Sequence, residues 1–218
     1  WLAQPIEFRP PLIDRVEELI VHHLIENQTT TAEKIKEVIY RDFPGIFTPQ
    51  DSALLNILES YADLVDPDRH VWRLRDSEQP TVRQADIRDI KESLAFIAQS
   101  LAFQDRGDDP ILWFDDPQKN AVFSFHVFSS AIISRHTLNT DPIAQHKILV
   151  LPGSRANLLA YKVQRNPILK KMLSENYLVV KFRLVRDLIA NPLLSRELFK
   201  EQIKVDPPEY QNSQLALF

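Results

Sequence analysis

The chain has 218 residues, of which 44% are hydrophobic and 26% charged, a composition typical of a globular protein with a sizeable core. It has no cysteine, which excludes disulfides and thiolate metal sites, and it lacks the apolar run of about 18 residues that would predict a membrane span. Its net charge of −4 is unevenly distributed: residues 1–79 hold 8 Lys/Arg against 15 Asp/Glu, a net of −7, whereas residues 147–204 hold 12 against 4, a net of +8. A basic stretch in an acidic chain is typical of a protein that binds a polyanion. We expect a cytoplasmic protein without a membrane segment.

The first third of the chain predicts three helices and a hairpin. Apolar residues at helical spacing predict a helix over 12–27, and a second helix over 30–43 has Thr30 and Glu33 at the positions of a capping box. A third helix begins near Pro49 and carries no lysine or arginine, so it is a poor reader of the DNA major groove. Residues 64–75 predict two short strands around a turn. This order is typical of a winged helix.

The rest of the chain predicts strands separated by helices. After a polar linker over 77–84, a helix is expected over 83–103. Strands are expected at 111–114, 121–128, 146–153 and 177–184, with helices at 129–138, 154–176 and 185–203. This order favours an α/β domain with a small mixed sheet. The expected class is therefore α+β, with a winged-helix-like domain over 1–79, an α/β domain over 80–205 and an extended tail over 206–218.

The paired strands at 111–114 and 121–128 suggest a restriction-endonuclease-like (PD-(D/E)XK) core. Such nucleases place an acid on one strand and an acid-X-lysine on the next, where carboxylates hold Mg²⁺ and the lysine activates water. Here the acid-X-lysine positions hold Ser124 and His126, which cannot replace a carboxylate and an ammonium. The remaining candidates near the first strand are Asp109, Asp115 and Asp116. We expect a nuclease-like fold without the catalytic groups, and no metal site.

Other chemistries have weaker support in the sequence. Ser124 and His126 share one strand face, but no G-x-S-x-G elbow surrounds the serine. The six histidines show no zinc-ligand spacing. The stretch PGSRAN (152–157) joins a strand to a helix and offers backbone N–H groups for a phosphate, although a plain turn is favoured. With three glycines in the chain, no Gly-rich cofactor loop is expected, and no cofactor is predicted.

The basic residues are the candidate DNA contacts, because neutralising phosphates requires cations. The basic residues of the stretch 147–204 are expected on or beside the helix over 154–176 and along the strand over 177–184. Two further arginines lie in the expected wing. The candidates are Arg155, Lys162, Arg165, Lys170, Lys171, Lys181, Arg183, Arg73 and Arg75.

Several segments together resemble a known group of proteins. They are TPQDSALLNILESYADLVDPDRHVWRLR (48–75), VFSFHVFSSA (122–131), LVLPGSRANLLAYKVQRNP (149–167), VKFRLVRDLIANPLLSRELFKEQIKVDP (180–207) and the closing QLALF. Their combination resembles the C-terminal region of prokaryotic DNA methyltransferase-like proteins of restriction-modification or related defence systems. The resemblance implies a catalytic methyltransferase domain upstream of Trp1, or else a partner subunit. The methyltransferase tetrapeptide is absent as such, since DPPEY (206–210) departs from it at its last position.

The sequence thus predicts a non-catalytic DNA-binding or target-recognition accessory region of a DNA-modifying system. Two alternatives stay open. One is an active Mg²⁺-dependent nuclease, in which the candidate aspartates would meet an acid from elsewhere in the chain. The other is a protein–protein interaction module.

Overall fold

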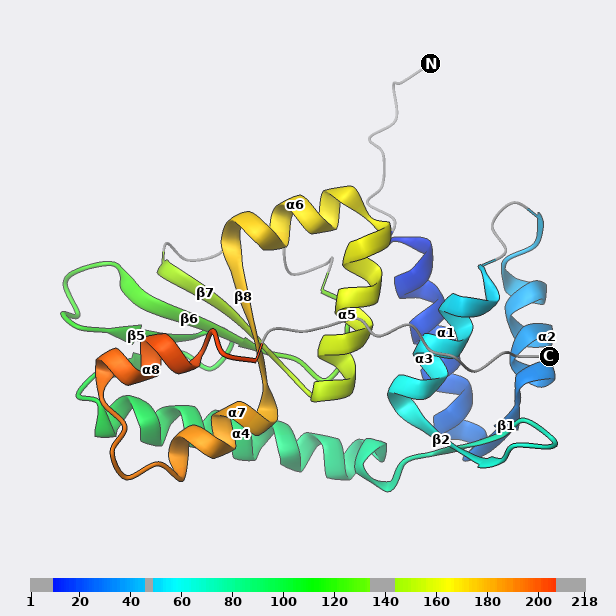
Figure 1. The fold of residues 1–218 in the computed structure, drawn as a ribbon, viewed down its shortest axis with the longest axis horizontal. Coiled ribbons are helices and arrows are strands. Elements are labelled where there is room, and N and C mark those ends of the chain that lie inside the picture. The colour runs from blue at the N-terminus through cyan, green and yellow to red at the C-terminus, as the bar shows by residue number, and fades with distance from the viewer. Residues whose placement is uncertain (1–9, 46–48, 134–143, 207–218) are drawn as a thin grey trace, which may run out of the picture.

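The computed structural model describes residues 10–45, 49–133 and 144–206. The protein is mixed α+β, with 54% helix and 21% strand, as the sequence predicts. It contains a three-stranded sheet near one end and a five-stranded sheet near the other (Figure 1). None of the described helices has the length and apolar character needed to cross a membrane.

The N-terminal part contains the expected three helices and hairpin, plus one short strand. Its elements are α1 (Leu12–Asn27), β1 (Thr29–Thr31), α2 (Ala32–Asp42), α3 (Asp51–Tyr61), β2 (Ala62–Asp66) and β3 (Val71–Leu74). The strands pair antiparallel in the order β1-β3-β2. Strand β1 could not be predicted from the sequence, because a strand of three residues shows no periodicity. Its partners on β3 are some 40 positions away along the chain. It displaces the helix cap by one residue, so that Thr31, and not Thr30, accepts the hydrogen bond from the Lys34 N–H at 3.2 Å.

The rest of the chain forms the five-stranded sheet and its helices. The elements are a 3₁₀ turn η2 (Asp76–Glu78), α4 (Pro80–Ser100), β4 (Gln104–Arg106), β5 (Ile111–Phe114), β6 (Ala121–Val127), β7 (Ala144–Leu151), α5 (Gly153–Arg165), α6 (Pro167–Asn176), β8 (Tyr177–Lys181), α7 (Phe182–Ile189) and α8 (Arg196–Gln202). The strand order is β4-β5-β6-β7-β8. Strands β4, β5 and β6 pair antiparallel, and β6, β7 and β8 pair parallel. The small mixed sheet expected from the sequence is therefore present.

Three expected segments differ from the structure. The polar stretch 77–84 is no linker: it holds the end of η2 and the first turn of α4, with Pro80 at the start of the helix. The strand expected over 177–184 ends at Lys181, and α7 begins at Phe182, because Phe182, Val185 and Leu188 bury one face at helical spacing. Residues 129–133 of the helix expected over 129–138 are not helical, and the remainder lies outside the described residues, as do residues 207–218 of the expected tail.

Two hydrophobic cores hold the fold together. One lies between α4, α7, α8 and one face of the larger sheet, where Trp113, Phe123 and Phe199 pack against one another. The other joins α1 and α3 to α5, α6 and the opposite face of that sheet, through residues such as Leu54 and Leu159. Helix α5 lies between the sheet and the N-terminal helices (Figure 1). The second core therefore contains residues from both sides of position 80.

Candidate nucleic-acid interface

The two residues predicted to stand at the catalytic positions of a nuclease-like core lie inside the protein. Ser124 and His126 on β6 are 0% and 5% exposed, and Ser124 Oγ lies 3.2 Å from His126 Nε2 in a hydrogen bond between them. The His126 ring also packs against Phe128 and Tyr177. This environment is that of a satisfied buried histidine in a strand.

The candidate aspartates do not converge on this pair. Asp109 is exposed and precedes β5, whereas Asp115 and Asp116 follow that strand. Asp115 forms an ion pair with Arg196 at 2.5 Å, and Asp116 accepts the Gln118 N–H at 3.0 Å within a turn. Among the described residues, no three His, Asp or Glu side chains are grouped so that they could hold a metal ion.

Arg155, a candidate DNA contact, is buried at the start of α5. Its guanidinium donates to the Ser60 carbonyl and the Ser129 carbonyl, forms an ion pair with Glu78, and lies 3.2 Å from the centre of the Tyr61 ring. Burial lowers the pKa of Arg155, and the charges of its neighbours, Glu78 among them, oppose that change.

Lys162, two turns further along α5, is buried in the same way. Its Nζ lies 2.5 Å from Asp14 Oδ1 and 2.5 Å from Glu17 Oε2, and it donates to the Ala131 carbonyl at 3.1 Å. Arg155 and Lys162 are not available at the surface for the predicted contact with DNA, because both are at most 1% exposed. Arg155 is paired with Glu78, and Lys162 with Asp14 and Glu17.

Other candidate DNA contacts are at least partly exposed, but several of them bond to groups of the same chain. Arg75 donates to the carbonyls of Glu59 and Ser60 at the end of α3 and pairs with Asp63 at 2.7 Å. Lys181 and Arg183 both bond Asp206, at 2.7 and 3.0 Å, and these hydrogen bonds, that of Lys181 first, lower the pKa of Asp206. Arg73 is exposed on β3, apart from the basic stretch.

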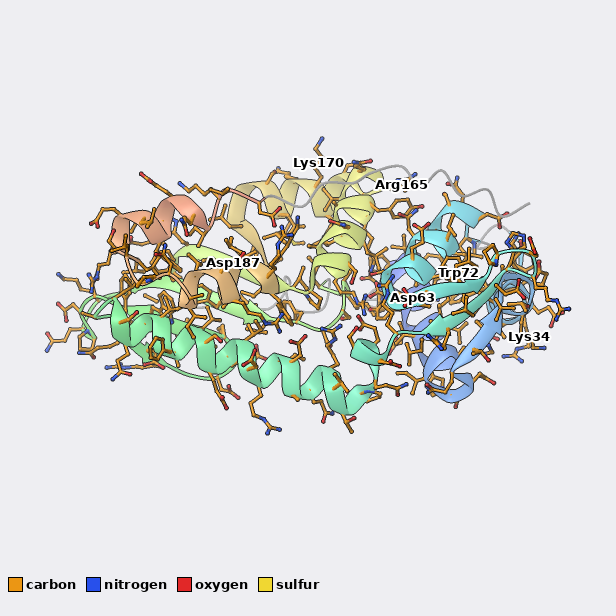
Figure 2. All side chains as sticks on the ribbon, turned by 60° about the horizontal axis from the view of Figure 1, so that its bottom comes forward. Lys34, Asp63, Trp72, Arg165, Lys170 and Asp187 are labelled. Carbon is orange, nitrogen blue, oxygen red and sulfur yellow. The ribbon has the colours of Figure 1, made fainter. Side chains whose placement is uncertain are left out.

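The remaining candidates lie together. Arg165 at the end of α5 and Lys170 on α6 are exposed on the same side of the molecule, and Lys171 is exposed beside Lys170 (Figure 2). Sequence reasoning missed two further exposed lysines, Lys200 near the end of α8, the last helix that the structure describes, and Lys204 just after it. We name Lys170, Lys171, Lys200 and Lys204 the α6–α8 lysine surface. Within the described part of the chain, none of these four lysines forms an ion pair.

A groove of about 430 Å³ is lined by one lysine of each pair, Lys170 and Lys204. It is bounded by α5, α6, β8 and residues 203–204, and Lys170 and Lys204 are the charged residues among its described lining. Nearby, burial lowers the pKa of His146 at the start of β7, and the charges of Lys200 and Lys204 lower it further.

A second cavity, of about 640 Å³, lies where α5 and α7 begin. It includes Gly153, so the segment considered for phosphate binding does face an opening. Its arginines are already engaged: Arg83 pairs with Glu78 and Asp86, and Arg186 pairs with Asp86. The α6–α8 lysine surface is therefore the better site for an anionic partner.

Comparison with known proteins supplies no relative from which a site could be transferred. No family model matches the chain, and neither a curated protein nor a solved structure matches it. The resemblance to DNA methyltransferase-like proteins and to the restriction-endonuclease-like fold stays a prediction.

Proposed function

We propose that this chain is a DNA-binding accessory region of a DNA-modifying system, and that it holds DNA phosphates through the α6–α8 lysine surface together with Arg165. The observation that carries the proposal is the contrast between two sets of cations. Arg155 and Lys162 are buried and neutralised by carboxylates, whereas the four lysines are exposed and form no ion pair with the described residues. Exposed cations without an acidic partner are available to phosphates and release counterions when they bind.

The N-terminal part supports a winged-helix-like assignment, with a role in positioning. Its element order α1-β1-α2-α3-β2-β3 and the strand order β1-β3-β2 are those of winged-helix domains. Helix α3, which would read DNA in such a domain, packs against α5: Ser52 Oγ lies 3.2 Å from Tyr161 Oη, and Ser60 Oγ donates to the Ser154 carbonyl at 3.0 Å. A helix in this position is covered by its own chain, which favours a scaffold over major-groove contact.

The larger sheet supports the degenerate nuclease-like assignment. Strands β5 and β6 are antiparallel neighbours followed by the parallel strands β7 and β8, and Ser124 lies opposite Leu112 in the β5–β6 pair. Ser124 and His126 would then occupy the positions of the catalytic acid and lysine. Under this proposal the upstream catalytic domain or partner subunit supplies the chemistry and this chain supplies affinity for DNA.

The proposal is tested by reversing the four charges together. The variant Lys170→Glu, Lys171→Glu, Lys200→Glu, Lys204→Glu should lose binding to a labelled duplex in fluorescence anisotropy at low salt. In the wild type, the logarithm of the affinity should fall linearly with the logarithm of the salt concentration, by about one unit of slope for each phosphate contact.

The matched control changes the net charge equally at exposed cations elsewhere. It is Lys34→Glu, Arg41→Glu, Arg88→Glu, Lys119→Glu. Lys34 lies at the end of the molecule formed by the N-terminal part, whereas Lys170 lies near the middle of the long axis (Figure 2). The control should keep most of the wild-type affinity. Equal losses in both variants, or no binding by the wild type, would refute the proposed surface.

A further inference from the structure

The groove between the lysines runs along the free edge of the larger sheet. Strand β8 is the last in the order β4-β5-β6-β7-β8, and among the described strands it pairs with β7 alone. Three consecutive residues of β8, Tyr177, Leu178 and Val179, line the groove. Because successive side chains of a strand point to opposite faces, a cavity that touches three in a row follows the edge of the strand. The backbone N–H and C=O groups on the outer side of an edge strand have no partner strand and can bond a ligand.

The lining of the groove combines three kinds of surface. Its walls are largely aliphatic, with Leu173 and Ile203 among them, and Tyr177 adds a half-buried aromatic ring. Gln164 and Ser174 add side-chain hydrogen-bonding groups. Lys170 and Lys204 add positive charge from α6 and from the segment after α8.

This combination matches a single-stranded nucleic acid better than a duplex. A duplex presents phosphates and keeps the faces of its bases stacked inside, so an apolar groove between lysines would have nothing apolar to contact. A single strand offers unstacked base faces flanked by phosphates, and proteins bind such strands with apolar and aromatic platforms in a basic groove. The volume of about 430 Å³ lies within the range of about 300–1,000 Å³ typical of small-molecule sites, so it can accept a nucleobase.

We infer that the β8-edge groove binds an unstacked base of single-stranded DNA. Tyr177 and Leu173 contact the base face, Gln164 and Ser174 bond its polar edge, and Lys170 and Lys204 hold the flanking phosphates. The inference rests on the proposed function and specifies the form of DNA that this surface prefers. An acidic peptide added to the strand edge fits less well, because the unpaired cations continue outside the groove at Lys171 and Lys200, as a polyanionic backbone requires.

The test compares oligothymidylate with a blunt duplex of the same length, by fluorescence anisotropy on the full chain. The wild type should bind the single strand more tightly. Ala160→Leu fills the groove from a half-exposed position of α5 without adding charge or an aromatic ring, and Tyr177→Leu removes the ring. Each should weaken binding of oligothymidylate by about tenfold, the effect expected from losing one stacked base. Duplex affinity should be unchanged in both.

Tyr40→Leu is the matched control, because Tyr40 is an exposed tyrosine on α2, remote from the groove, at 45% exposure. It should bind both probes as the wild type does. Equal affinity of the wild type for the two probes, or an undiminished preference in Ala160→Leu, would overturn the inference while leaving the proposed function intact. Binding of neither probe, including the case in which only an acidic peptide binds, would overturn both.

Discussion

Lys162 Nζ lies 2.5 Å from Asp14 Oδ1 and 2.5 Å from Glu17 Oε2, inside the contact between α5 and α1. Glu17 in turn accepts hydrogen bonds from Tyr61 Oη at 2.5 Å and from the Ala131 N–H at 3.0 Å. Removing charges from water is costly, so a buried cluster persists only where each charge has partners. This cluster links segments that are 145 or more residues apart and fixes how the N-terminal helices lie on α5.

Replacing Lys162 by methionine should destabilise the protein strongly. The substitution keeps the length of the side chain but leaves Asp14 and Glu17 buried without their cation. We expect the free energy of unfolding to fall by about 3–5 kcal/mol, measured by urea denaturation. The control Lys170→Met, at an exposed position, should change it by less than about 0.5 kcal/mol. Similar small changes in the two variants would show that the buried cluster adds little.

Replacing Arg155 by lysine should also destabilise, although the charge is kept. The guanidinium bonds two carbonyls and Glu78 while its plane lies over the Tyr61 ring, and one ammonium cannot make all these contacts. Because a buried acceptor is left unsatisfied, the loss should be about 1–3 kcal/mol in urea denaturation. Arg165→Lys, at an exposed arginine whose guanidinium lies 3.8 Å from the centre of the Tyr161 ring, should be nearly neutral. A neutral Arg155→Lys would contradict this account.

Tyr61 should make stability fall at alkaline pH. Burial raises the pKa of Tyr61 well above its ordinary value of 10.0, and the nearby Glu17 carboxylate raises it further. The unfolded chain loses this proton near pH 10 while the folded chain keeps it, so the stability is fully present below about pH 10 and is lost as the pH rises beyond it. Tyr61→Phe should be less stable at neutral pH, because it loses the bond to Glu17, but its stability should fall less steeply above pH 10. The exposed Tyr40→Phe should follow the wild-type pH profile.

Binding of DNA should raise the pKa of His146. Burial lowers the pKa of His146, and the charges of Lys200 and Lys204 lower it further, so phosphates bound at these lysines would cancel part of the electrostatic effect. Binding would then take up a proton, and because burial still holds the pKa of His146 below its ordinary value of 6.5, affinity should rise as the pH falls below 6.5. An NMR titration of His146 with and without oligothymidylate measures the change directly. His146→Gln should reduce the pH dependence of affinity, and a pKa of His146 that DNA leaves unchanged would place the phosphates elsewhere.

The sequence by itself determined those helices and strands whose hydrophobic pattern lies within one short segment of the chain. The apolar stripe of α3, with Leu54, Ile57, Leu58 and Tyr61 buried, and the short apolar runs of β5 and β6 are local patterns that depend on neighbours in the chain. The sequence also contains a local signal for the burial of two cations. Arg155, Leu159 and Lys162 are separated by four and then three residues, so helical spacing places both cations on the apolar face of α5.

The tertiary structure alone decided which cations are available to a ligand. In the sequence Lys162 and Lys170 look alike, yet one is 1% exposed and bound to two carboxylates, and the other lies at the surface. The basic stretch over 147–204, which in the sequence is typical of a protein that binds a polyanion, is partly explained by pairing within the molecule. The reason is that a Coulomb interaction depends on distance in space. Folding brings Asp14, Glu17 and Glu78 to α5 from positions that no local pattern connects to it.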